Sequence, residues 1–165
     1  MSNYRNKKGF SLVEMIIYLS LMTIITLVIV QSIVIILRSN KQSFNNNVIE
    51  NSAVSVLERV KRETRRAKNI DLINSNLANG DLQLNVLLDN GSTSTVKIIQ
   101  SDGKVNVYEG GVFSGPLTIN GVNVTSLSFK QIQTEKSEAI RTTLVINSGD
   151  KTGTFYSTEI LRGSY

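Results

Sequence analysis

The feature that most constrains this chain is an apolar run of 28 residues, from Phe10 to Leu37. It contains no proline, no glycine and a single charge, that of Glu14. As an α-helix this run would be about 42 Å long, which exceeds the roughly 30 Å of a bilayer's hydrocarbon core. Its other polar residues are serine, threonine and glutamine, which membrane helices tolerate. We therefore expect residues 10–37 to form a transmembrane helix.

The residues around this run give it a direction. Arg5, Lys7 and Lys8 precede it and no acidic residue accompanies them, which predicts a cytoplasmic N-terminus. A conventional secretory signal would have a shorter apolar stretch, of about 7–15 residues, and a small-residue cleavage site after it. The carboxylate of Glu14 is costly within such a helix, and the next positive charge is that of Arg38. Its partner must therefore come from another chain or from a newly created terminus.

The boundary between the basic and apolar residues carries a recognisable pattern. Residues 7–14 read KKGFSLVE, which resembles the class III signal of type IV prepilins. In that family a membrane aspartyl peptidase cuts after the glycine and methylates the new N-terminal residue. The resemblance implies that Gly9 ends a cleaved leader and that Phe10 becomes the methylated N-terminus. It also implies that Glu14, the fifth mature residue, neutralises the amino terminus of a neighbouring subunit in a filament core.

The resemblance also implies partners and a location. The partners are a prepilin peptidase/methyltransferase, other major and minor pilins, and an inner-membrane assembly platform. The chain would sit in the bacterial cytoplasmic membrane with an extracytoplasmic head, and then enter a pilus or pseudopilus. Major pilins usually carry a proline at about the twenty-second mature residue, where this chain has Gln31, and its single proline is Pro116. This departure favours a minor pilin or pseudopilin that primes or caps a filament.

Helical periodicity returns after the apolar run, within residues 38–69. Apolar residues at steps of three and four predict one buried stripe: Ala53, Val56, Leu57, Val60, Thr64, Ala67 and Ile70. The opposite surface is basic, and Arg59, Arg62 and Arg66 are candidates for a subunit or DNA contact. We expect Glu58 with Arg62, and Arg59 with Glu63, to pair one turn apart. The helix is predicted to end near Asn69.

The remaining residues, 70–165, alternate as in a sheet. Strands are expected at 82–88, 96–100, 105–107, 122–133, 140–146 and 155–161. Asp89-Asn90-Gly91 predicts a turn, and Asp102-Gly103 predicts a two-residue hairpin. The sequence therefore predicts an α+β pilin fold with about five antiparallel strands on a long helix. Its domains would be a cleaved leader (1–9), a transmembrane or filament-core helix (10–37), an amphipathic continuation (38–69) and a β-rich head (70–165).

Composition argues against chemistry in this head. The chain has no cysteine and no histidine, which rules out disulfides, thiol nucleophiles, imidazole bases and the commonest metal ligands. No spacing of acidic residues matches a calcium loop. We therefore predict that the protein is not an enzyme, has no catalytic residues and uses no cofactor or metal.

The head's sequence resembles minor pilins more loosely. The nearest types are the J-type pseudopilin of type II secretion and the W-type minor pilin. Two other functions stay open at this point. One is a competence pseudopilus subunit for DNA uptake, for which the basic helix surface would contact phosphates. The other is a membrane-anchored surface adhesin that never polymerises, which would have no use for Glu14.

Overall fold

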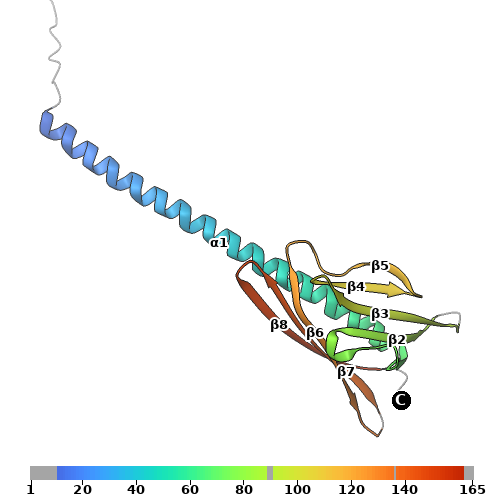
Figure 1. Ribbon diagram of the computed structural model, residues 1–165. Coiled ribbons are helices and arrows are strands. Elements are labelled where there is room, and N and C mark those ends of the chain that lie inside the picture. The colour runs from blue at the N-terminus through green and yellow to red at the C-terminus, as the bar shows by residue number, and fades with distance from the viewer. Residues whose placement is uncertain (1–10, 89–90, 136, 162–165) are drawn as a thin grey trace, which may run out of the picture. The chain divides into compact units, whose positions relative to one another are not determined.

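The computed structural model describes residues 11–88, 91–135 and 137–161. It has an α+β architecture, in which one long N-terminal helix is followed by antiparallel strands (Figure 1). This confirms the predicted fold class. The elements follow one another as α1 (Leu12–Arg66), β1 (Ala67–Ile70), the short 3-10 helix η1 (Leu77–Asn79), β2 (Asp81–Leu87), β3 (Thr93–Ser101), β4 (Lys104–Glu109), β5 (Val112–Pro116), β6 (Asn123–Gln133), β7 (Glu138–Ser148) and β8 (Lys151–Ile160).

The chain divides into two compact units, of which the first ends at Ser43 and the second begins at Phe44. In the first unit every described residue is exposed except Glu14, which is half-buried. Within the described part of the chain, α1 is the one helix long and apolar enough to cross a membrane. The absence of proline and glycine explains the unbroken helix. The finer domain boundaries expected from the sequence stay predictions.

The second unit contains two antiparallel sheets. One has five strands in the order β1-β2-β3-β4-β5, and the other has three in the order β6-β7-β8. The predicted hairpin at Asp102-Gly103 is confirmed, because Ser101 pairs with Lys104 around it. Its two turn residues have positive φ angles of 51° and 69°, as a type I′ turn requires. For the turn expected at 89–91, residues 89 and 90 lie outside the described residues.

The core of the second unit joins the helix to both sheets. The predicted stripe is buried from Ala53 through Val60, with Leu57 half-buried. Alternating residues of the strands complete the core, so that β2 and β7 each bury every second side chain. Leu84 and Leu144 from the two sheets are fully buried. This burial of one face per strand gives the second unit its stability.

Two details of the sequence prediction are wrong. The helix ends at Arg66 rather than near Asn69, and Ala67–Ile70 form β1 instead. Both Ala67 and Ile70 are buried, as the apolar stripe predicts, but they lie in a strand and not in the helix. The described residues form eight strands in two sheets, where about five strands were expected. β5 was missed because its residues Val112 and Phe113 are exposed and do not alternate.

Candidate functional site

The first candidate site lies at the start of α1. Of its predicted residues, the leader charges Arg5, Lys7 and Lys8 and the cleavage residues Gly9 and Phe10 lie outside the described residues. Glu14 is in the first turn of the helix. The hydroxyl of Tyr18, one turn later, donates a hydrogen bond of 3.2 Å to Glu14 Oε1. Sequence reasoning overlooked Tyr18, although its spacing of four residues from Glu14 was a usable signal.

Several hydroxyl side chains of this segment form hydrogen bonds within the helix. The hydroxyls of Thr23, Thr26 and Ser32 each donate to a backbone carbonyl one turn earlier, at 2.8 Å. Glu14 differs from them, because none of the described residues forms an ion pair with it. Tyr18 supplies a hydrogen bond but no opposite charge. Within the apolar segment 12–37, Glu14 is therefore the one carboxylate, and its charge has no opposite partner among the described residues.

The second candidate site is the basic end of α1, where three predicted arginines meet at one carboxylate. Glu63 is 1% exposed, and its Oε1 lies 3.1 Å from Arg59 Nε and 3.3 Å from Arg62 Nε. Its Oε2 lies 3.9 Å from Arg66 Nη1. The predicted pair of Arg59 and Glu63 is thus present, whereas Arg62 contacts Glu63 instead of the exposed Glu58. The structure brings all three arginines of the predicted contact together.

Arg59 also connects the helix to a sheet. Its Nη2 pairs with Glu109 at the end of β4, and its Nε approaches Glu63 without the alignment of a hydrogen bond. Because Arg59 is mostly covered and engages two carboxylates, it acts as a structural tie within the head. Arg62 and Arg66 keep about half of their side-chain surface exposed, 58% and 45%.

The rest of the basic surface is tied to the other sheet. Arg65 Nη2 lies 3.1 Å from Glu159 Oε2 in β8, and Lys61 Nζ lies 3.8 Å from Glu159 Oε1. The basic helix face is therefore two separate ionic clusters, one on each sheet. A continuous stripe that could follow a nucleic-acid backbone is broken up by these carboxylates.

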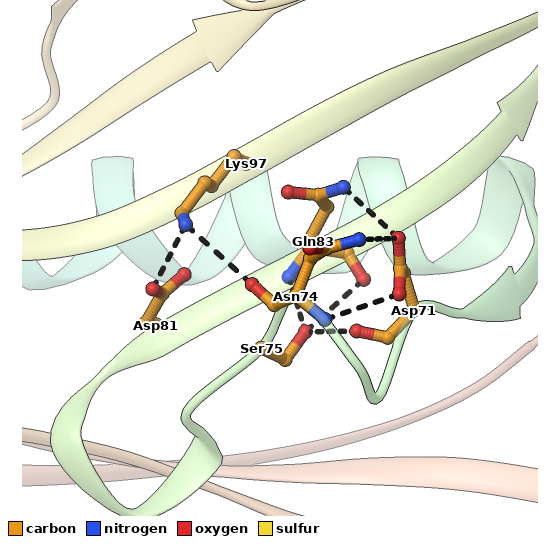
Figure 2. Close-up of polar contacts among 6 residues, drawn as sticks. All are labelled: Asp71, Asn74, Ser75, Asp81, Gln83 and Lys97. Carbon is orange, nitrogen blue, oxygen red and sulfur yellow. Dashed lines mark hydrogen bonds and ion pairs between the residues drawn. The ribbon is translucent and has the colours of Figure 1, made fainter.

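A third polar cluster holds the loop between β1 and β2 (Figure 2). Asp71 accepts hydrogen bonds from the Asn74 side chain at 2.8 Å and from the Gln83 side chain at 3.0 Å. The side-chain hydrogen bond from Asn74 is the largest cause that lowers the pKa of Asp71 below its ordinary value. Nearby, Lys97 forms an ion pair of 2.9 Å with Asp81. These contacts fix the loop and leave Asp71 and Asp81 engaged with protein partners.

Residues suited to hold a metal do not cluster in the part of the chain that the structure describes. In the described ranges no group of three or more acidic side chains, the ligand types this chain offers, could hold an ion. The grouping at Asp71 consists of one carboxylate satisfied by amide donors, which is the arrangement of a stabilised loop. The chemistry that the described geometry supports is ion pairing and apolar contact.

The comparisons with known proteins bear on the N-terminal segment. Residues 4–30 match the family model described as the prokaryotic N-terminal methylation motif. This range contains Gly9, Phe10 and Glu14. Neither the comparison with curated proteins nor that with solved structures gives a match. The motif, together with the long apolar helix and the antiparallel sheets, supports a type IV pilin-like protein with a prepilin-type N-terminal signal.

Proposed function

We propose that this chain is a minor type IV pilin or pseudopilin, a structural subunit that primes or caps an extracytoplasmic filament. The observation that carries the proposal is the methylation motif at residues 4–30, whose described part from Leu12 onward lies in the apolar segment of α1 where Glu14 is the one charge. A simple anchor would need the apolar length but not the carboxylate. The glutamine at position 31, in place of the helix-kinking proline of major pilins, supports a minor subunit.

Cleavage after Gly9 explains why Glu14 is present. The cut creates a positive α-amino group at Phe10, and methylation leaves that nitrogen positively charged. In a filament the amino group of one subunit would meet Glu14 of a neighbour, away from water. An unpaired charge in such an environment is strongly disfavoured, so the pair would set the axial position of each new subunit. Tyr18 would hold the Glu14 carboxylate through its hydrogen bond while the pair forms.

The partners and route follow from the same segment. A prepilin peptidase would process the chain in the bacterial inner membrane, and an assembly platform would add it to other pilins. The basic leader would keep the N-terminus cytoplasmic, so that the head faces outward. The exposed apolar side chains of α1 would pass from lipid into contact with the corresponding helices of neighbouring subunits.

A second candidate function, a pseudopilus subunit for DNA uptake, is favoured by the exposed guanidinium groups of Arg62 and Arg66. The two carboxylates beside them and the division of the basic surface into two clusters argue for the structural role instead. Direct measurement of oligonucleotide binding separates the two functions.

The processing step tests the proposal. Mass spectrometry of the protein isolated from its native membrane should show the 156-residue chain from Phe10 to Tyr165, with a methyl group on the N-terminal nitrogen of Phe10. The Gly9→Val variant should stay as the uncut 165-residue precursor, because a branched side chain does not fit a site that selects glycine. Recovery of residues 5–9 in assembled filaments would refute the proposal.

A further inference from the structure

The head contains a cleft at the basic end of α1 with a volume of about 390 Å³. Three guanidinium groups, those of Arg59, Arg62 and Arg66, and two carboxylates, those of Glu63 and Glu109, line it. This volume lies within the roughly 300–1,000 Å³ that is typical of ligand clefts. Its walls come from the helix and from the five-stranded sheet, which both belong to the second compact unit.

The charges of this cleft do not balance. Arg59 is committed to Glu63 and Glu109, whereas Arg62 and Arg66 each approach Glu63 with one nitrogen, at 3.3 Å and 3.9 Å. A guanidinium group has five N–H donors, so most donors of these two side chains stay unused by Glu63. Among the described residues that line the cleft, three positive groups against two negative ones leave a net positive charge. The buried Glu63 therefore holds two arginines whose remaining N–H groups can donate hydrogen bonds to a further oxyanion.

The remaining lining of the cleft is partly apolar. Val86 and Val96 are buried in the sheet, and Leu88 is about one-third exposed beside them. A ligand that brings an aliphatic group together with its negative charge would cover this surface and gain from both contacts. None of the described residues that line the cleft is aromatic, so a nucleic-acid base would find no side chain among them to stack on.

We propose that this cleft binds an acidic segment of a partner protein, with a carboxylate held between Arg62 and Arg66 and a neighbouring aliphatic side chain packed on Leu88. Arginine pairs with a carboxylate through two parallel hydrogen bonds, a geometry that the exposed ends of both side chains allow. Glu63 and Glu109 repel every anion, but a carboxylate brings a single negative charge, whereas the closely spaced phosphates of a nucleic acid bring several and meet stronger repulsion. The site is a property of the head and does not require that the chain polymerises.

Binding of a synthetic peptide tests this inference with the full-length protein in non-ionic detergent micelles. The probe is a fluorescein-labelled peptide of alternating leucine and glutamate, and its counterpart carries glutamine in place of glutamate. Fluorescence anisotropy should show binding of the acidic peptide that weakens as salt is added. The glutamine peptide should bind at least about tenfold more weakly, because the charge-assisted hydrogen bonds are lost.

Paired variants locate the site. Arg62→Gln with Arg66→Gln should weaken binding about tenfold or more. Lys68→Gln with Lys104→Gln removes the same charge from exposed positions outside the cleft and should change binding less than about twofold. Arg62→Lys with Arg66→Lys keeps the charge but not the paired geometry and should be intermediate. Near-ultraviolet circular dichroism verifies that each variant is folded.

Three results would overturn the inference. The first is failure of the acidic peptide to bind, and the second is equal binding of the glutamine peptide. The third is tighter binding of a twelve-residue oligothymidylate that the Arg62 and Arg66 substitutions abolish, which would make the cleft a nucleic-acid site.

Discussion

The two halves of α1 are built from one continuous helix and meet opposite surroundings. In residues 12–43 all apolar side chains are exposed, whereas in residues 44–66 the stripe that includes Val56 and Val60 is almost completely buried. The second half has its partners within the same chain, namely the strands of the head. The first half has none among the described residues, and in the proposed function lipid or other subunits would cover it. The same secondary structure thus serves folding in one half and, in the proposed function, would serve assembly in the other.

Removal of the apolar run should give the largest effect of all the changes, a gain in solubility, while the head stays folded. Deletion of residues 1–37 should give a soluble, folded monomer, because the exposed apolar run is the chief barrier to solubility. Dispersed amide signals in a heteronuclear spectrum would check this. An aggregated or unfolded product would show that the head depends on the apolar helix, and the comparison between the two halves would fail.

Matched leucine truncations compare the two regions directly. Leu84→Ala, in the core of the head, should lower the free energy of unfolding by about 2–5 kcal/mol. Leu27→Ala, on the exposed helix surface, should change it by less than about 0.5 kcal/mol. Thermal unfolding of the full-length protein in detergent, followed by tyrosine circular dichroism, measures both. Equal losses from the two substitutions would mean that the first half also packs within the monomer.

Loss of Glu63 should have an intermediate effect. Breaking a buried ion pair costs about 3–5 kcal/mol, but Arg62 and Arg66 are half exposed and water screens their charges. We therefore expect Glu63→Ala to cost about 1–2 kcal/mol. Glu58→Ala, on the exposed face of the same helix, is the matched control and should cost less than about 0.5 kcal/mol. Chemical denaturation of both variants measures these free energies of unfolding. Identical curves would contradict the view that Glu63 holds the arginines in place.

The fixed loop at Asp71 should give the smallest effect, confined to low pH. Its folded-state pKa lies below the ordinary value of 3.8, so the carboxylate stabilises the folded loop above that pH. The contribution should disappear as the pH falls through the folded-state pKa. In the wild type, the Asn74 amide should then lose protection from hydrogen exchange. In Asp71→Asn, which has no carboxyl group to protonate at this position, the protection should not change over the same pH range. Titration of the Asp71 carboxyl at or above its ordinary pKa would contradict this account.

Much of the fold could be predicted from local patterns. The three-and-four spacing around Val56 and Val60 is the direct imprint of one buried helix face, and Asp102-Gly103 specifies a hairpin by its own backbone preferences. The helix end could not be predicted from the local pattern. Ala67 and Ile70 continue the helical spacing, but in the fold they belong to β1, which pairs with β2. The division into two sheets depends on long-range pairing, which no local window contains.

The candidate sites show the same limit. Glu14 stands out because a charge within an apolar run is rare, and no tertiary contact is needed to notice it. Glu63 was expected only as a partner of Arg59. Its position three residues after Val60 places it on the buried stripe, a signal that it would be covered by the head and would attract more than one arginine. The pairing of Arg62 with Glu63 instead of Glu58 could not be predicted, because it depends on the burial of Glu63, which only the folded structure determines.

The most direct test of the account is the entry of Glu14→Ala into filaments. The variant should be cut normally after Gly9, yet the ratio of sheared to membrane-held protein should fall strongly, because an unpaired charge in the core costs about 3–5 kcal/mol. Ser20→Ala removes a polar group from the same helix without removing a charge and should behave as the wild type. A wild-type ratio for Glu14→Ala, with cleavage intact, would contradict the claim that this carboxylate neutralises the amino terminus of a neighbouring subunit.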